Sequence, residues 1–424
     1  MINKKIGVMT LGLTLMMLAS CGPNSNKGNY VPPKAEGSDN ITYFCPSTDV
    51  KYMEEVVAAF KAANPDYTGE ITLQAEIGEG DVKAEVQKDI NAAADVVLLA
   101  DDNVRSLVGS RGLVSWSPEE TAYMVEHNGE SMVSAMQING KTYGIPYRGD
   151  NGYQVIYDKT LVTADDVKSL EGLLAKAKQK GYYVGYNLSE GWYVPAPFFA
   201  NGVKLEFNEE GKFETDINGE KGLQAIRAMS DLWVEYGGTT WLDTSAPDNF
   251  GPAATTRKCA QIIWNATTQI AGLIGEENVG VAQLPTLKIN GVDKQLHTYA
   301  GVKGVAVVNK ENMPDSKKAT AKAFALFIAS TEMQEKRLVD LGQGVTDKAV
   351  VAKTELWSAN PFLNSLAAQQ NAGAAQVQAN HANGAWWENS KIMMTNVTAQ
   401  DKNNPLTDAQ LQAALDACAT AISE

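Results

Sequence analysis

Short apolar runs alternate along the chain with segments whose apolar residues recur at helical spacing. Residues 41–44 form the first run, and residues 53–60 place apolar side chains three and four positions apart. Further apolar runs follow at residues 71–73 and 95–99. The run at 95–99 is continuous, which is typical of a strand buried on both faces. These patterns predict strands that alternate with helices.

The middle of the chain continues the alternation. We expect strands at residues 184–186, 260–264 and 302–308, and helices at residues 223–233 and 317–341. Alternating strands and helices predict open α/β sheets with parallel strands. In such sheets ligands bind beyond the carboxyl ends of the strands. That rule points to three polar residues that follow predicted strands, namely Thr48, Asp101 and Asp102.

The N-terminus has the features of an export signal. Lys4 and Lys5 precede an apolar run at residues 6–19, which is shorter than the roughly 20 residues needed to span a bilayer. Residues 18–22 resemble a bacterial lipobox, which implies cleavage before Cys21 and lipidation of its thiol. A plain signal peptide with a chance cysteine is the alternative. Residues 22–40 are polar and rich in Gly, Pro and Asn, so we expect a flexible tether.

Composition narrows the classes of partner. The 424 residues suit two or three domains, and the formal net charge of −14 becomes −16 without the first twenty residues, which carry two lysines and no acid. An acidic surface repels nucleic acid and anionic lipid, so we expect neither as a partner. The other cysteines are Cys45, Cys259 and Cys418, whose spacing fits no metal site. We expect no metal and no cofactor.

The order of segments resembles extracellular solute-binding proteins of the maltose and maltodextrin-binding kind. The landmarks cover nearly the whole chain after the tether; they are residues 52–65, 95–100, 112–114, 139–146, 155–159, 284–286 and 301–307. The resemblance implies a two-lobe, class II periplasmic-binding-protein fold, with an open α/β sheet in each lobe and segments that cross between the lobes. It also implies a monomer that closes on its ligand and delivers it to the permease subunits of an ABC importer.

The resemblance also gives boundaries. We expect a signal peptide at residues 1–20, the lipidated cysteine and tether at 21–40, one lobe from 41–150 with 298–344, and the other from 151–297 with 345–424. The crossings are expected near residues 149–152, 295–299 and 342–346. The protein is then held at the outer face of the cytoplasmic membrane by lipid alone.

A carbohydrate ligand requires acceptors and donors for its hydroxyl groups and flat rings for its C–H faces. The resemblance places Glu190 as a hydroxyl acceptor and Trp192 as a stacking ring, with Gly191 where the family has proline. Tyr193 is a further candidate. The alternative is that Trp192 and Tyr193 belong to the core.

Other candidates come from the same resemblance. Of Trp386 and Trp387, one is expected to stack on the sugar and the other to pack. Trp264 and Asn265 are candidates because Thr267 stands where the family has a stacking tryptophan. Leu99 replaces another such tryptophan, so the ligand is expected to differ from a long maltodextrin.

Four polar residues complete the candidate set. Asp102 matches a hydroxyl-binding aspartate of the family, with a helix N-cap as the alternative. Asp150 matches an acidic contact and Arg148 is an additional donor, although the two could instead form a structural ion pair. Thr48 closes the loop after the first strand.

Two other classes of function remain open. The chain has no HExxH, CxxC or GxSxG motif, and adjacent carboxylates at one strand end rarely flank a scissile bond, so we expect no enzyme. Asp102, Asp150, Glu190 and Trp192 would suit a polyamine, but Arg148 would repel a cation. A lipoprotein that binds another protein is the last alternative, and it predicts no closure on a ligand.

Overall fold

The computed structural model describes residues 30–75, 81–208 and 210–423. The predicted signal peptide, Cys21 and most of the predicted tether lie outside the described residues. In the part of the chain that the structure describes, no helix combines the length and the apolar character needed to cross a membrane.

The first sheet has the strand order β2-β1-β3-β17-β6. Its strands are β1 (Ile41–Phe44), β2 (Ile71–Gln74), β3 (Val96–Ala100), β6 (Ile145–Asn151) and β17 (Gly301–Val307). β1 pairs in parallel with β2 and β3, as the sequence predicts. β17, however, is antiparallel to β3 and β6, so the sheet is mixed. The chain reaches β17 only after it has formed the second sheet, and it returns in the opposite direction.

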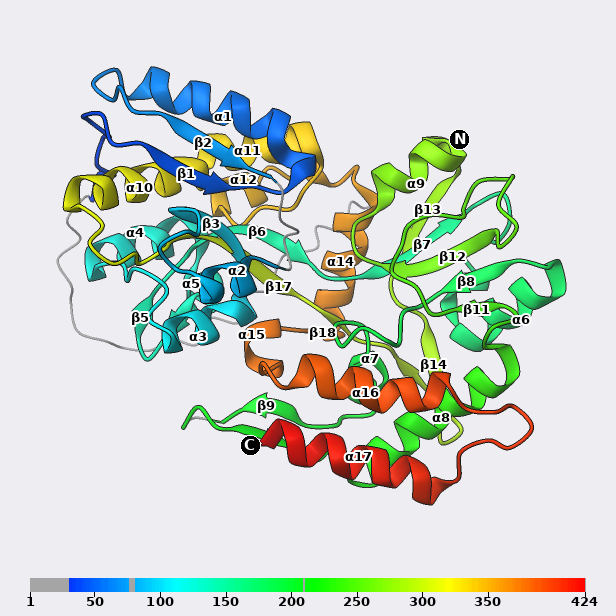
Figure 1. Cartoon of the computed structure of the whole chain (residues 1–424). Coiled ribbons are helices and arrows are strands. Elements are labelled where there is room, and N and C mark those ends of the chain that lie inside the picture. The colour runs from blue at the N-terminus through cyan, green and yellow to red at the C-terminus, as the bar shows by residue number, and fades with distance from the viewer. Residues whose placement is uncertain (1–29, 76–80, 209, 424) are drawn as a thin grey trace, which may run out of the picture. The chain divides into compact units, whose positions relative to one another are not determined.

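Helices cover both faces of the first sheet (Figure 1). One face carries α1 (Val50–Ala63), α10 (Asp315–Ile328) and α11 (Thr331–Leu341), and the other carries α2 (Val82–Lys88) and α3 (Asp101–Gly109). The single helix expected at 317–341 is two helices, because the side chain of Ser330 caps the N-terminus of α11 by accepting from the Met333 N–H.

The second sheet has the strand order β11-β8-β12-β7-β13. Its strands are β7 (Gln154–Asp158), β8 (Tyr183–Gly185), β11 (Trp241–Leu242), β12 (Lys258–Ile263) and β13 (Val279–Ala282). β12 is parallel to β8 and antiparallel to β7. Every residue of β7 and of β12 is buried, so both strands lie in the interior of this half.

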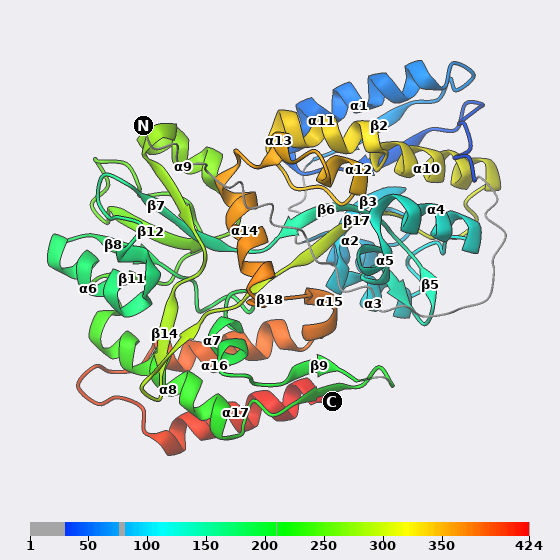
Figure 2. The ribbon, with the colours of Figure 1, turned by 180° about the vertical axis from the view of Figure 1, so that it is seen from behind.

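Helices surround the second sheet as well. They include α6 (Leu170–Lys180), α8 (Glu220–Tyr236) and α14 (Pro361–Asn371), and the C-terminal pair α16 (Trp386–Thr398) and α17 (Asp408–Ser423). Figure 2 shows α16 and α17 side by side and next to α8, with which both are in contact. Apolar residues of α8, α16 and α17 share one core with those of the second sheet.

The remaining strands and α-helices lie outside the two five-stranded sheets and the helices named above. The strands are β4 (Gln137–Ile138), β5 (Lys141–Thr142), β9 (Leu205–Phe207), β10 (Phe213–Thr215), β14 (Thr286–Ile289), β15 (Val292–Gln295), β16 (Thr298–Tyr299) and β18 (Ala375–Gln376). The helices are α4 (Pro118–Asn128), α5 (Glu130–Ser134), α7 (Ala196–Ala200), α9 (Thr267–Ile274), α12 (Lys348–Val351), α13 (Thr354–Trp357) and α15 (Gln378–His381).

The segments expected to cross between the halves lie against one another. A Cβ at Gly152 would meet the carbonyl oxygen of Tyr299 at 2.5 Å, so the first and second crossings touch there. A Cβ at Gly344 would meet the Cβ of Asp150 at 2.6 Å, which joins the third crossing to the first. Both positions therefore need glycine to allow close approach.

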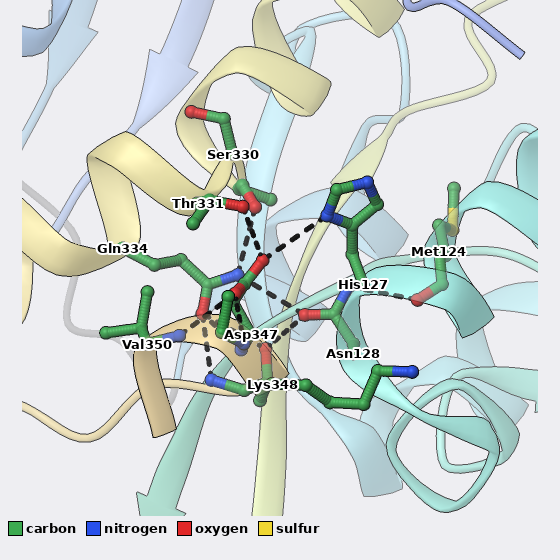
Figure 3. A network of polar contacts seen from close by, with 12 residues as sticks. Met124, His127, Asn128, Ser330, Thr331, Gln334, Asp347, Lys348 and Val350 are labelled. Atoms are coloured by element: carbon green, nitrogen blue, oxygen red, sulfur yellow. Dashed lines mark hydrogen bonds and ion pairs between the residues drawn. The ribbon is translucent and has the colours of Figure 1, made fainter. Parts of the chain in front are cut away.

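A buried polar network fixes the chain just after the third crossing (Figure 3). The Asp347 carboxylate accepts from the Ala349 and Val350 N–H groups, at 2.9 and 3.2 Å, and from the Thr331 hydroxyl. The Gln334 amide oxygen accepts from the N–H groups of Thr346 and Asp347. α12 consequently packs against α4 and α11, beside the first sheet, before α14 reaches β7 and β13. The division into lobes expected at residue 345 stays a prediction.

Candidate functional site

Two of the predicted residues converge on a residue that the sequence did not indicate. The Gln378 side chain donates to Asp102 Oδ1 at 2.6 Å, and its oxygen accepts from the Trp192 indole N–H at 3.1 Å. The same oxygen accepts from the side-chain amide of Asn151 at 3.0 Å. Asp102 lies in the first turn of α3, beside the first sheet. Trp192 lies in the loop after β8, and Asn151 is the last residue of β6. One glutamine amide therefore joins both halves of the molecule to a crossing strand.

Asp102 and its neighbour Asp101 are two carboxyl groups at the end of β3. Asp101 is buried and accepts from the N–H groups of Asp102, at 2.9 Å, and of Val302, at 3.1 Å. Burial, together with the charge of Asp102, raises the pKa of Asp101 to about 8. Burial raises the pKa of Asp102 to about 6, although Lys83 and the Gln378 hydrogen bond oppose the shift. Desolvation thus makes Asp102 a strong acceptor that retains a proton more readily than an exposed aspartate.

The raised pKa of Asp102 predicts a pH dependence of folding stability. The folded chain binds this proton more tightly than the unfolded chain. Protonated Asp102 therefore makes its full contribution to the free energy of unfolding below about pH 4. This contribution is lost as the pH rises through about 6. Wild type should therefore lose on the order of 1–3 kcal/mol more unfolding free energy between pH 4 and pH 7 than Asp102→Asn. Urea denaturation of both proteins across this range, without ligand, measures the difference. Equal changes in unfolding free energy with pH for the two proteins would contradict a raised pKa of Asp102.

Arg148 and Asp150 form an ion pair at the first crossing. Arg148 Nε lies 3.1 Å from Asp150 Oδ1, and Asp150 Oδ2 accepts from the Gly344 N–H at 2.8 Å. Asp150 is only 3% exposed. Although burial acts to raise the pKa of Asp150, the Arg148 charge and the Gly344 N–H hold it below its ordinary value. Both carboxylate oxygens are engaged within the protein, which favours the structural ion pair over direct contact with a ligand.

A half-buried aspartate, Asp243, positions the loop that carries Glu190 and Trp192. The Asp243 carboxylate accepts from the Leu188 N–H, and from both the N–H and the hydroxyl of Ser189. Asp243 directly follows β11, so the rule that polar residues at strand ends surround ligand sites could have indicated it. Glu190 itself is exposed, and it accepts from the Asn187 side chain at 3.3 Å.

The aromatic residues of this loop differ in exposure. Trp192 is half-buried and makes edge contacts with Tyr153 and Tyr193, each with ring centroids 5.1 Å apart. Tyr193 is buried in the core, and its hydroxyl oxygen accepts from the Trp264 backbone N–H. Trp264 is 36% exposed, and its neighbour Asn265 accepts from the Thr267 hydroxyl at 2.7 Å. Trp192 and Trp264 thus retain accessible ring surface, whereas Tyr193 does not.

Trp386 and Trp387 have different environments at the start of α16. Trp386 is fully buried, and its indole donates to the Gly191 carbonyl oxygen at 3.0 Å. A Cβ at Gly191 would lie 2.7 Å from the Trp387 carbonyl oxygen, so the family's proline has no room there. Trp387 is half-buried, with its ring 6.2 Å from that of Tyr299. Trp386 is the indole that packs, and Trp387 remains the candidate for contact.

Thr48 lies away from the Gln378 cluster, whereas Tyr299 lies near it. Thr48 is exposed and donates to Asp49, which is itself paired with Arg337 at 2.9 Å, so Thr48 is not brought to the Gln378 cluster. The Tyr299 hydroxyl is fully buried and has no hydrogen-bond partner among the described residues. Burial raises the Tyr299 pKa, and Asp102 and Asp101 raise it further, so Tyr299 lies near these two carboxyl groups.

The chain matches a known protein family in sequence and several solved proteins in structure. A model of the family described as bacterial extracellular solute-binding protein matches residues 55–365. A structure solved with acarbose is 25% identical with a TM-score of 0.80, covering 91% of this chain and 99% of that one. The maltodextrin-binding protein MalE1 from L. casei BL23, without ligand, is 23% identical with a TM-score of 0.75, covering 92% and 100%.

A Thermus thermophilus maltotriose-binding protein with maltotriose is 18% identical with a TM-score of 0.69, covering 91% of this chain and 99% of that one. None of the curated proteins compared with the chain matches it significantly. The structural matches confirm the two-lobe α/β fold that the sequence predicts.

Proposed function

Because the chain belongs to the bacterial extracellular solute-binding protein family, we propose that it captures a saccharide between its two halves and delivers it to an ABC importer. The observation that carries the proposal is the convergence of Asp102, Gln378 and Trp192, from three separate segments, on one point. Similarity to proteins solved with acarbose and with maltotriose supports a carbohydrate ligand. The proposed role is binding and delivery, without catalysis.

The side chains suit a polyhydroxylated ligand. Asp102 offers a charged acceptor, and hydrogen bonds to charged groups are stronger than neutral ones. The indole edge of Trp192 offers a donor, and its half-buried ring offers a face for C–H groups. Trp387 and Trp264 are proposed as further ring contacts, and Glu190 and Asn265 as hydroxyl partners at the edge of the site. Thr48, Arg148 and Asp150 have weaker support, because their partners are within the protein.

A polyamine is the second candidate, since Asp101 and Asp102 are adjacent carboxyl groups. Two cations oppose it: Lys83 and Lys303 lie close enough to Asp102 to lower its pKa against the effect of burial. Trp192 and Asn151 donate hydrogen bonds here, and an ammonium group cannot accept them. These charges favour a saccharide.

A thermal-shift screen tests the proposed function. Glucose, maltose, maltotriose and acarbose would be compared with spermidine on the chain without its first twenty-one residues. A ligand present at about one hundred times its dissociation constant should add about 2.7 kcal/mol to the unfolding free energy. We expect a saccharide to raise the melting temperature and spermidine to leave it unchanged. Stabilisation by spermidine alone would contradict the proposal.

Attachment to the outer face of the cytoplasmic membrane through lipidated Cys21 is proposed from the lipobox alone. A monomeric state is proposed from the resemblance to solute-binding proteins. Changing Cys21→Ser should release the protein from the membrane fraction or leave its signal uncleaved, since the thiol is the site of acylation. Fractionation of cells that express each form measures this, and unchanged attachment of the variant would exclude a lipid anchor at Cys21.

A further inference from the structure

The Gln378 side chain is held among the groups proposed to bind the ligand. The residue is 4% exposed and begins α15, a helix of four residues. Its backbone is fixed independently of its side chain: β18 pairs in parallel with β16, and the Gln378 carbonyl accepts from the Ala382 N–H at 3.1 Å. α15 also packs against α3 and β9. These contacts hold the main chain without using the Gln378 side chain.

The hydrogen bonds of Gln378 match those of a hydroxyl group. Its amide nitrogen donates one bond to a carboxylate, and its oxygen accepts two bonds, from Trp192 and Asn151. A hydroxyl likewise donates one hydrogen bond and accepts two. A sugar hydroxyl at this point would satisfy Asp102, Trp192 and Asn151 in the same way.

We propose that the Gln378 amide occupies the position of a ligand hydroxyl, and that the ligand displaces it on binding. This inference rests on the proposed function and adds a specificity-determining residue to it. Displacement leaves no unpaired charge buried, because the Gln378 amide is neutral. Asn151 and Trp192 lose the amide oxygen as their acceptor and gain a neutral ligand hydroxyl in its place. The buried Tyr299 hydroxyl, which has no hydrogen-bond partner among the described residues, lies near Asp101 and Asp102 and can form a further bond to the incoming ligand.

The displacement sets a requirement on the ligand. A group that only donates, such as an ammonium, restores the bond to Asp102 but leaves the Trp192 and Asn151 donors unpaired, and unpaired buried donors are unfavourable. A group that only accepts leaves Asp102 without its donor. Gln378 therefore selects for neutral ligands that present a hydroxyl, or two neighbouring ones, at this position.

Calorimetric titration with maltotriose tests the inference on wild type, Gln378→Ala and Gln376→Ala. Removal of the competing amide should tighten binding by about tenfold, which corresponds to about 1.4 kcal/mol. Gln376→Ala is the matched control, because its side chain lies two residues away and contacts His297 instead. It should bind as wild type does. Equal or weaker binding by Gln378→Ala, with wild type binding normally, would overturn the inference but not the proposed function. No binding by wild type to any saccharide of the thermal-shift screen would overturn both.

A crystal structure of wild type with maltotriose keeps the inference testable if Gln378→Ala does not fold. We expect a sugar hydroxyl within hydrogen-bond distance of Asp102 Oδ1 and Trp192 Nε1, with the Gln378 amide turned away. An amide that keeps its bond to Asp102 in the complex would overturn the inference.

Discussion

Replacing Trp386 by alanine is expected to lower the free energy of unfolding by about 3–5 kcal/mol, the usual effect of emptying a buried tryptophan site. The indole is fully buried among apolar side chains of the second half and donates to the Gly191 carbonyl oxygen. Alanine removes both the ring and this hydrogen bond, and the 190–193 loop loses its attachment to α16. Urea denaturation monitored by circular dichroism measures the loss.

Trp264→Ala is the matched control for this experiment, because the Trp264 ring is 36% exposed. Its unfolding free energy should change by about 0.5 kcal/mol or less, as for most surface substitutions. A loss below about 1 kcal/mol for Trp386→Ala would contradict its assignment to the core.

Replacing Trp192 by alanine is expected to weaken saccharide binding by about 2–4 kcal/mol, the range for a central aromatic anchor. The ring face offers area to the sugar, and the indole N–H is directed at the point where Asp102 and Gln378 meet. Stability should fall less than for Trp386→Ala, because Trp192 is only half-buried. Calorimetric titration with maltotriose measures the change in affinity.

Trp192→Phe separates the two contributions of this residue. Phenylalanine keeps an aromatic face but has no N–H, so its loss of affinity should be intermediate. A Trp192→Ala protein that binds maltotriose as wild type does, but melts well below it, would assign Trp192 to the core.

The sequence predicted the fold because the pattern of apolar residues is a local signal that recurs in each strand and helix. Apolar runs identified β1, β3, β12 and β17 to within two residues at either end. The antiparallel direction of β17 was missed, since direction depends on where the chain has been in between. The break between α10 and α11 was also missed, although Ser330 is a recognisable N-cap residue.

The candidate site was predictable only where a strand end marks it. Asp102 follows β3, and the strand-end rule indicated it. Gln378 lies in a four-residue helix with no periodic pattern, so only tertiary structure reveals its contacts. Trp386 and Trp387 are adjacent on one helix, and their sequence alone does not determine which one faces the core. The ligand, the lipid anchor and the boundaries of the lobes stay predictions.

The claim that a saccharide is held at the Asp102–Gln378–Trp192 cluster is tested most directly by nitrogen–proton spectra of the tryptophan indoles during titration with maltotriose. We predict that saturation shifts the Trp192 Nε1–H resonance, because its hydrogen-bond acceptor changes from the Gln378 amide to the ligand. The Trp386 resonance should stay in place, because its acceptor is the Gly191 carbonyl oxygen within the core. Saturable binding of maltotriose that leaves the Trp192 resonance unmoved would contradict the account.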